Sequence, residues 1–294
     1  MEKQAVRKET KPQIRTFLEM VKFSHTIFAL PFALLAAMLA ADGLPGIWKI
    51  FWIIVAMAGA RTGAMGANRL LDAGFDAKNP RTRDRALPAG LITIRQVLWL
   101  TMLSYLVFIL AAAALNPLCL HLAPYIIIIL TSYSLAKRFT PHTHYILGFC
   151  LALAPLGAWI AVTGALAPTP LILGLAVGCW VSGFDLLYAL QDIDFDQSVG
   201  LKSIPAAIGV AATLTLARKL HLLMLGALFV IFLITPALDW LFFCALLVVA
   251  ALLHYEHELL SPDDLSRIDT AFFTVNGYVS IILFVVGALD ILGG

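Results

Sequence analysis

The chain has 294 residues, of which 61% are hydrophobic and only 13% are charged, and its formal net charge is +2. Soluble domains carry about 25% charged residues, so this composition excludes an ordinary soluble domain. The apolar residues also occur in runs of about twenty, the length that crosses the hydrocarbon core of a bilayer as a helix. We therefore expect an all-α, polytopic membrane protein.

Nine membrane-spanning helices are expected, with Pro or Gly at most junctions between them. They cover residues 17–41, 47–71, 96–116, 118–136, 143–164, 169–190, 214–235, 237–256 and 269–292. Residues 1–16 form a polar leader, which we interpret as cytoplasmic rather than as a cleaved signal peptide because a full-length span follows it. Residues 17–294 are expected to form one domain.

Lysine and arginine residues gather on one side of the predicted spans. They occupy the leader, the loop after the second span (Lys78, Arg81, Arg83 and Arg85) and the segments after the fourth, sixth and eighth spans, whereas the other side has only Lys49. By the positive-inside rule, the N-terminus and these segments are cytoplasmic and the C-terminus lies outside. The expected location is the inner (cytoplasmic) membrane of the cell.

Two rows of polar side chains lie at cytoplasmic span ends. Asn68, Asp72 and Asp76 recur at every fourth residue of the second span, and Asp192 and Asp196 repeat this step after the sixth. This interval places each row along one face of a helix. A single aspartate at a helix end is usually a solvated charge. Two rows at equivalent ends favour a site for a hard cation such as Mg²⁺, which prefers oxygen ligands.

Basic residues accompany these rows. Arg81 and Arg85 lie in the loop after the second span, while Tyr133 and Lys137 are four residues apart and are expected to share a helix face. Facing rows of opposite charge would largely neutralise one another unless a polyanion lay between them. A diphosphate bridged to aspartates by Mg²⁺ and held by Arg and Lys satisfies both charge signs. The alternative is that the basic residues only set the membrane topology.

Three motifs follow one another along the chain. The first is Asn68-x3-Asp72-x3-Asp76 followed by Asn79-Pro-Arg81-Thr82-x2-Arg85, the second is Tyr133-x3-Lys137-Arg138-x-Thr140, and the third is Asp185-x2-Tyr188-x2-Gln191-Asp192-x2-Phe195-Asp196. Together they resemble the signatures of the UbiA superfamily of intramembrane prenyltransferases. The resemblance implies nine transmembrane helices around a central cavity, with cytoplasmic cap loops at about 72–95 and 191–213.

The resemblance also implies an activity and the residues that carry it. The reaction would be Mg²⁺-dependent transfer of a polyprenyl chain from a polyprenyl diphosphate to a small aromatic acid similar to 4-hydroxybenzoate, in ubiquinone or menaquinone biosynthesis. It would proceed by ionisation of the diphosphate and electrophilic aromatic substitution. Two Mg²⁺ would be held by Asn68, Asp72, Asp76, Asp192 and Asp196. The diphosphate would be contacted by Arg81, Arg85, Tyr133, Lys137, Tyr188 and Lys22. The four aspartates and Lys137 would form the catalytic set.

Arg61 is a charge within the second predicted span. It precedes Asn68 by seven residues, so it lies on nearly the same helix face, ~10 Å deeper by helical rise. We expect Arg61 to bind the carboxylate of the aromatic acceptor. The alternative is a structural arginine paired with a buried acid or with backbone carbonyl groups.

Other functions remain open. A haem O or chlorophyll type of prenyltransferase would share the aspartate motifs, and a transporter or cation channel could use the aspartate rows as a binding site. Beyond its substrates and membrane lipid the chain is expected to need no obligate protein partner, and no nucleic-acid-binding patch is visible. His142 and His144 have no cysteine or carboxylate at metal-ligand spacing, so we expect no zinc site there.

Overall fold

The computed structural model describes residues 13–21 and 28–293, and these residues are helical apart from turns, connecting loops and an isolated β-bridge between Ser261 and Asp264. The first helices are α1 (Gln13–Met20), α2 (Leu30–Ala41), α3 (Ile47–Asp76), α4 (Ile94–Leu115), α5 (Pro117–Ser132), η2 (Tyr133–Arg138) and α6 (Thr143–Thr163). They are followed by α7 (Pro168–Ala189), η3 (Leu190–Asp192), α8 (Ile193–Val199), α9 (Ile204–Ile208), α10 (Val210–Ile234), α11 (Trp240–Glu258), η4 (Thr270–Val275) and α12 (Asn276–Gly293). The all-α prediction is confirmed.

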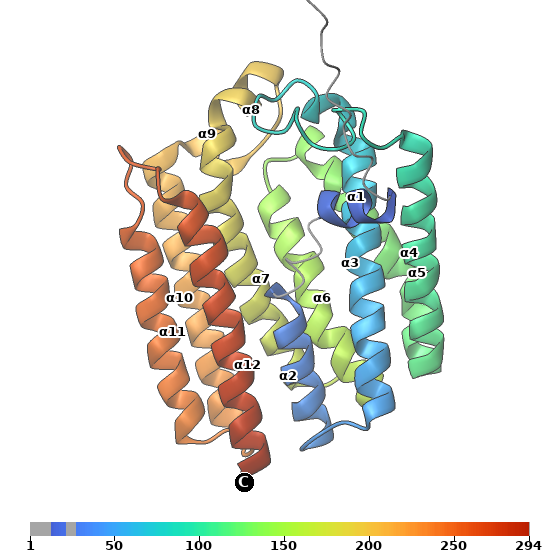
Figure 1. Ribbon diagram of the computed structural model, residues 1–294. Coiled ribbons are helices and arrows are strands. Elements are labelled where there is room, and N and C mark those ends of the chain that lie inside the picture. The colour runs from blue at the N-terminus through green and yellow to red at the C-terminus, as the bar shows by residue number, and fades with distance from the viewer. Residues whose placement is uncertain (1–12, 22–27, 294) are drawn as a thin grey trace, which may run out of the picture.

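Long helices form one bundle (Figure 1). Within the described residues, eight helices are long and apolar enough to cross a membrane, and α2 is a shorter apolar helix of 12 residues. This is close to the nine expected spans. Outward-facing side chains are largely apolar, as shown by Leu103, Leu106 and Leu247, each at least 50% exposed. An apolar outer surface around spanning helices identifies a multi-pass membrane protein.

The expected first span, residues 17–41, is not a single α-helix over the residues that the structure describes. Its first residues belong to α1, which ends at Met20, and α2 begins only at Leu30. The reason is tertiary packing: Phe17, Met20 and Val21 are buried against Leu87, Ile92 and Val97. Helix α1 is therefore held at the end of the bundle that carries the loop after α3. The expected boundary between leader and domain falls inside α1, while Lys22 and residues 1–12 lie outside the described residues.

Helix α3 is the longest helix of the described chain, with 30 residues, and it packs closely on α4. A Cβ atom added at Gly59 would lie 2.9 Å from the backbone nitrogen of Phe108 and from the carbonyl oxygen of Ser104. Gly63 and Gly66 similarly face the side chains of Tyr105 and Thr101. Small residues let the backbones of membrane helices approach one another. This contact fixes the long helix whose last two turns carry Asn68, Asp72 and Asp76.

Two segments cap the bundle at the end opposite the C-terminus (Figure 1). One is the loop of residues 77–93 between α3 and α4, and the other comprises η3, α8 and α9. The region expected as a second cap loop thus contains short helices. It is joined to η2 by a hydrogen bond of 2.9 Å from the backbone nitrogen of Lys202 to the carbonyl oxygen of Lys137. The caps therefore bring together segments that follow α3, α5 and α7.

Close packing of α3 on α4 predicts opposite effects for two substitutions on α3. Gly59→Ala should lower the melting temperature, because its Cβ would press on the backbone of α4. Gly74→Ala meets nothing within 4 Å and should preserve or raise stability, since Ala is favoured over Gly in helices by up to ~1 kcal/mol. Circular dichroism of detergent-solubilised protein measures both. Equal shifts in one direction would contradict the proposed contact.

Candidate active site

The end of α3 is tied to η2 through Asp72. Lys137 Nζ donates a hydrogen bond of 2.8 Å to Asp72 Oδ2, and Asn68 Nδ2 donates one of 3.1 Å to the same oxygen. Asn68 Nδ2 also lies 3.1 Å from Ser134 Oγ, which accepts from it. Asp72 is buried, with only 4% of its surface exposed, so its charge depends on these partners.

The expected common face of Tyr133 and Lys137 is wrong. Residues 133–138 form a 3₁₀-helix rather than an α-helix, and in a 3₁₀-helix side chains three residues apart lie on one face. Ser134 and Lys137 accordingly contact Asn68 and Asp72. Tyr133 lies on another side of this helix, near Arg61 and Arg69.

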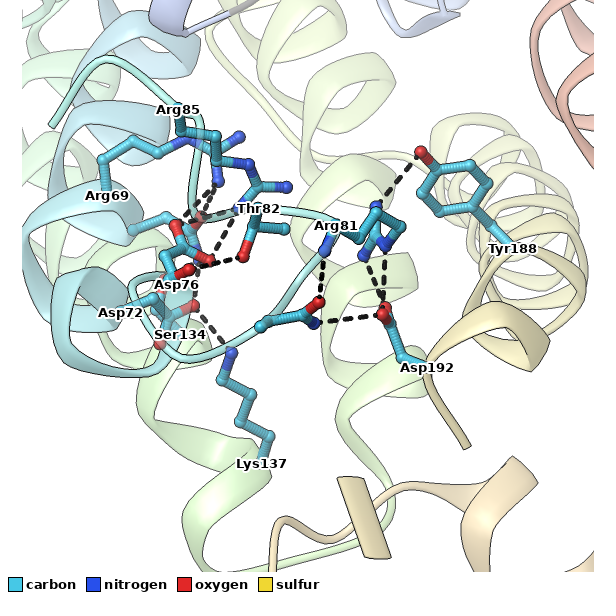
Figure 2. A network of polar contacts seen from close by, with 12 residues as sticks. Arg69, Asp72, Asp76, Arg81, Thr82, Arg85, Ser134, Lys137, Tyr188 and Asp192 are labelled. Carbon is cyan, nitrogen blue, oxygen red and sulfur yellow. Dashed lines mark hydrogen bonds and ion pairs between the residues drawn. The ribbon is translucent and has the colours of Figure 1, made fainter. Parts of the chain in front are cut away.

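Asp76 forms a second group of contacts at the end of α3. Arg85 Nη1 lies 2.8 and 2.9 Å from its two carboxylate oxygens, and Arg69 Nη1 lies 3.7 Å from Oδ2. Thr82 Oγ1 donates to the backbone carbonyl oxygen of Asp76 at 3.0 Å. Figure 2 shows Arg69 and Arg85 converging on Asp76 from α3 and from the loop. The loop that follows α3 thus folds back on the helix end.

Asp192 gathers a third group. Arg81 Nε donates to Asp192 Oδ1 at 3.0 Å, and Arg81 Nη2 donates to Oδ2. Arg81 Nη1 also donates to Tyr188 Oη at 3.4 Å (Figure 2). Asn79 Nδ2 donates to Asp192 Oδ1 at 3.3 Å. Partial burial alone would lower the pKa of Arg81, but its hydrogen bonds to Asp192 and the charge of this carboxylate raise that pKa above its ordinary value. Arg81 therefore stays cationic.

Most of the residues predicted from the sequence lie at this capped end. The aspartate rows do not touch each other; the loop between α3 and α4 joins them, contacting Asp76 through Arg85 and Asp192 through Arg81. Asp196 follows on α8 and is half-buried. Arg61 is half-buried on α3, below the aspartate row, and Lys22 lies outside the described residues.

Oxygen ligands of the right kind for a hard divalent cation are present. No three His, Cys, Asp or Glu residues of the described chain already converge on one point. However, Asp72 Oδ1 is buried without a hydrogen-bond partner among the described residues, and Arg138 Nη2 lies 4.0 Å from it. A buried carboxylate oxygen without a hydrogen bond is costly. The donor set therefore fits Mg²⁺, which prefers carboxylate oxygens.

Sequence reasoning assigned no part in the charge network to Arg69 and Ser134, and treated Arg138 only as part of a motif. Arg138 Nη2 donates to the carbonyl oxygen of Leu71, and its guanidinium lies 5.3 Å from the centre of the Phe75 ring. Arg69 precedes Asp76 by seven residues, a spacing that places both on one α-helical face. That spacing could have identified Arg69. Ser134 could be identified only with the 3₁₀ geometry in hand.

Comparison with known families gives one clear match. The family model described as the UbiA prenyltransferase family matches residues 29–278. The 4-hydroxybenzoate octaprenyltransferase of Aeromonas hydrophila subsp. hydrophila is 30% identical over 254 residues, which cover 85% of this chain and 86% of that relative. The 4-hydroxybenzoate octaprenyltransferase of Photobacterium profundum is 27% identical, and the match covers 95% of this chain and 97% of the relative.

Solved structures agree with the fold. The apo structure of a UbiA homolog from Aeropyrum pernix K1 matches with a TM-score of 0.83 and 29% identity, over 92% of this chain and 99% of that one. A UbiA homolog from Archaeoglobus fulgidus bound to DMAPP and Mg²⁺ matches with a TM-score of 0.71, over 94% of this chain and 99% of that one. At 18% identity, the second likeness concerns the fold alone.

Pairing of Arg81 with Asp192 predicts how the loop between α3 and α4 is held. Asp192→Asn should increase amide hydrogen exchange at residues 79–83, because it removes the charge that holds Arg81. Asp194→Asn, at an exposed position of α8, is the matched control and should leave exchange unchanged. Hydrogen–deuterium exchange with mass spectrometry measures both. Equal exchange in the two variants would show that the loop is held by other contacts.

Proposed function

The chain belongs to the UbiA prenyltransferase family, as its motifs indicated, and we propose that it transfers a polyprenyl chain from a polyprenyl diphosphate to a 4-hydroxybenzoate-like aromatic acid. The observation that carries this proposal is the arrangement of buried (Asp72, Asp76) and half-buried (Asp192) carboxylates, each paired with a Lys or Arg, at one end of the bundle. Such a site has partners for both a divalent cation and a polyanion. The family favours this enzymatic interpretation over a transporter or channel.

Relatives support both substrates and the metal. Two of them are named 4-hydroxybenzoate octaprenyltransferases, and the Archaeoglobus fulgidus homolog has been solved with GPP and Mg²⁺ as well as with DMAPP and Mg²⁺. We propose two Mg²⁺ for this chain. Asn68, Asp72 and Asp76 would hold one, and Asp192 and Asp196 would hold the other. The pathway is ubiquinone or menaquinone biosynthesis.

Binding of the donor requires an exchange of partners. The ion pairs of Asp72 with Lys137, Asp76 with Arg85, and Asp192 with Arg81 already satisfy both signs of charge. A diphosphate bound together with Mg²⁺ would provide a cation for the carboxylates and an anion for the basic side chains. The basic side chains then turn to the diphosphate oxygens, joined by Tyr188, which already accepts from Arg81, and by Tyr133. Lys22 completes this proposed set.

Ionisation of the donor is the step that these residues favour. As the allylic C–O bond breaks, negative charge accumulates on the leaving diphosphate, and Arg81, Arg85 and Lys137 stabilise it in surroundings that are poor in water. Mg²⁺ supplies further neutralisation of this charge. The allylic carbocation must then meet an electron-rich ring carbon before it meets water. Residues that orient the acceptor below the diphosphate therefore decide which product forms.

Arg61 is the proposed anchor of the acceptor. It lies on the continuous α3 helix seven residues before Asn68, ~10 Å farther from the capped end by helical rise. Its guanidinium suits bidentate binding of an aromatic carboxylate. An acceptor anchored there would extend its ring toward the diphosphate. The long prenyl chain would remain among apolar helices and membrane lipid, with no protein partner required.

Orientation in the membrane follows from the distribution of charge. We propose that the capped end faces the cytoplasm, that the C-terminus lies outside, and that the protein resides in the inner membrane of the cell. The basic loop 77–93 and the C-terminus are at opposite ends of the bundle (Figure 1). Residues 17–294 act as a single domain. The aromatic acid and the polar diphosphate end of the donor would then both enter the site at its cytoplasmic side.

Loss of either aspartate group should abolish turnover. With purified protein, Mg²⁺, a polyprenyl diphosphate and 4-hydroxybenzoate, Asp72→Ala and Asp192→Ala should each reduce product formation by about 10²-fold or more, because each removes preorganised charge stabilisation. Mass spectrometry quantifies the prenylated acid. Asp194→Ala, at an exposed position beside Asp192, is the control and should keep wild-type activity.

Two results would contradict this proposal, the first its assigned residues and the second its reaction. One is undiminished turnover in either aspartate variant that is folded by circular dichroism. The other is a wild-type protein that gives no prenylated product with any donor length or aromatic acid, together with Mg²⁺-dependent flux across vesicles.

Binding of the acceptor by Arg61 predicts a selective kinetic change. Arg61→Gln should raise the KM for the aromatic acid about tenfold or more while changing the KM for the diphosphate little, since one charged hydrogen-bonded contact contributes about 1.5–3 kcal/mol. Steady-state kinetics with each substrate varied in turn measures the two constants. Equal effects on both would indicate a structural arginine.

A further inference from the structure

A carboxylate of α7 lies beneath the diphosphate residues and takes no part in their ion pairs. Asp185 is three residues before Tyr188, so the two share a helix face, and Asp185 is about one turn deeper. The neighbouring Phe184, Leu186 and Leu187 are buried, whereas the side chain of Asp185 is 24% exposed. Part of its side chain is therefore accessible, and Tyr188, which meets Arg81, lies one turn above it on the same helix face. Acidic residues inside membrane helices are costly and tend to mark function.

Asp185 is held from behind by a histidine of another helix. His144 Nδ1 lies 2.7 Å from Asp185 Oδ2, and the His144 side chain is only 5% exposed. The other ring nitrogen, Nε2, is buried and has no hydrogen-bond partner in the described part of the chain. The ring is thus oriented through its contact with Asp185. Because His144 belongs to the first turn of α6, the positive end of that helix dipole also faces the carboxylate.

Tight packing of α6 on α7 fixes this pair. Ser182 Oγ donates to the backbone carbonyl oxygens of Gly178, at 2.7 Å, and His144, at 3.2 Å. A Cβ atom added at Gly148 would collide with Ser182 Oγ and with the carbonyl oxygen of Gly178. The two backbones are therefore in close contact one turn below the pair. A contact this close allows His144 little freedom relative to Asp185.

We propose that Asp185 is the proton acceptor of the prenyl transfer and that His144 is its positioning residue. The inference rests on the proposed function. Of the two side chains, Asp185 is the more exposed, and it shares a helix face with Tyr188 of the proposed diphosphate site. His144 is enclosed and acts only through Asp185, by fixing the direction of its carboxylate. Neither residue is paired with Asp72, Asp76 or Asp192, so the role is separate from holding the diphosphate.

The bond changes define what Asp185 does. The allylic C–O bond breaks and its electron pair leaves with the diphosphate. A ring carbon next to the acceptor's hydroxyl then forms a C–C bond to the allylic carbon with two ring electrons. The C–H bond at that ring carbon breaks, its electron pair restores the aromatic ring, and the proton goes to the Asp185 carboxylate. Asp185 finally passes the proton to water or to the departing diphosphate. No oxidant or further reactant is required.

Replacing Asp185 should leave ionisation of the prenyl diphosphate largely intact while slowing formation of the prenylated acid. Asp185→Asn should slow formation of the prenylated acid by about 10²-fold, the usual contribution of a general base. Diphosphate release should fall much less, because Arg81, Arg85 and Lys137 are intact, and water should capture the carbocation as prenyl alcohol. An acceptor deuterated at the prenylated ring position should react with a primary isotope effect in this variant and with none in the wild type.

Further variants distinguish a base from a structural group. Asp185→Glu keeps a carboxylate, so its rates of diphosphate release and of prenylated-acid formation should again be equal. His144→Leu should show the same uncoupling as Asp185→Asn in weaker form, and His144→Gln, which keeps a donor, should retain most activity. The matched control is His142→Gln, since His142 is exposed at the same helix start and stacks on Tyr145; it should behave as wild type.

The results that overturn the inference differ from those that overturn the function. If diphosphate release and prenylated product fall together in folded Asp185→Asn, with no isotope effect and no prenyl alcohol, Asp185 is structural. Full activity in Asp185→Asn would also refute its role. If the wild type releases no diphosphate and prenylates no aromatic acid, the proposed function fails, and the inference fails with it.

Discussion

Opposite charges brought together at the end of an apolar bundle are the interaction on which the rest of this structure depends. Asp72 and Asp76 are almost fully buried, and carboxylates so placed are unfavourable unless cations lie beside them. The cations come from elsewhere in the chain: Lys137 from η2, Arg85 from the loop after α3, and Arg69 from α3 itself. The ion pairs therefore join segments that helix packing alone would leave separate.

The same pairs keep the site assembled and suit it to a diphosphate. Pairing each carboxylate with a base holds loop 77–93 and η2 close to α3 while the donor is absent. A metal-bound diphosphate could replace each ion pair with two new contacts, one between the carboxylate and the metal and one between the basic side chain and the diphosphate. During binding, the carboxylates and the basic side chains would then exchange one charged partner for another, and none of them would have to be buried without a partner. Because the basic residues are already close, they can meet charge as it develops on the leaving group.

Much of this arrangement could be predicted from local sequence, because helix periodicity is a local property. The row of Asn68, Asp72 and Asp76 lies on one α-helix, as its four-residue spacing indicated. The prediction that Tyr133 and Lys137 share a face was wrong, because residues 133–138 form a 3₁₀-helix. Side chains four residues apart do not lie on one face of such a helix. The packing of α1 against residues that follow α3 could not be predicted. Residues 17–41 are apolar over a length that could cross the membrane, and such a run does not indicate that its first residues pack at the end of the bundle.

Partners that are distant in sequence were the hardest to predict. His144 had no carboxylate at metal-ligand spacing, and its actual partner, Asp185, is 41 residues away. The pairing depends on the glycine-mediated approach of α6 and α7, which only the three-dimensional structure reveals. Similarly, Arg81 was expected to face a diphosphate, but its direct partner in the protein is Asp192, 111 residues away.

Equilibrium binding of an unreactive prenyl thiolodiphosphate tests the central claim most directly. Isothermal titration calorimetry would measure the affinity of the wild type, Asp72→Ala and Asp192→Ala for this analogue, each with and without Mg²⁺. If the carboxylates exchange their bases for a metal-bound diphosphate, the wild type binds the analogue only with Mg²⁺, and either substitution removes that dependence together with tight binding. Tight binding by the wild type without Mg²⁺, or unchanged Mg²⁺-dependent binding in both variants, would contradict the account.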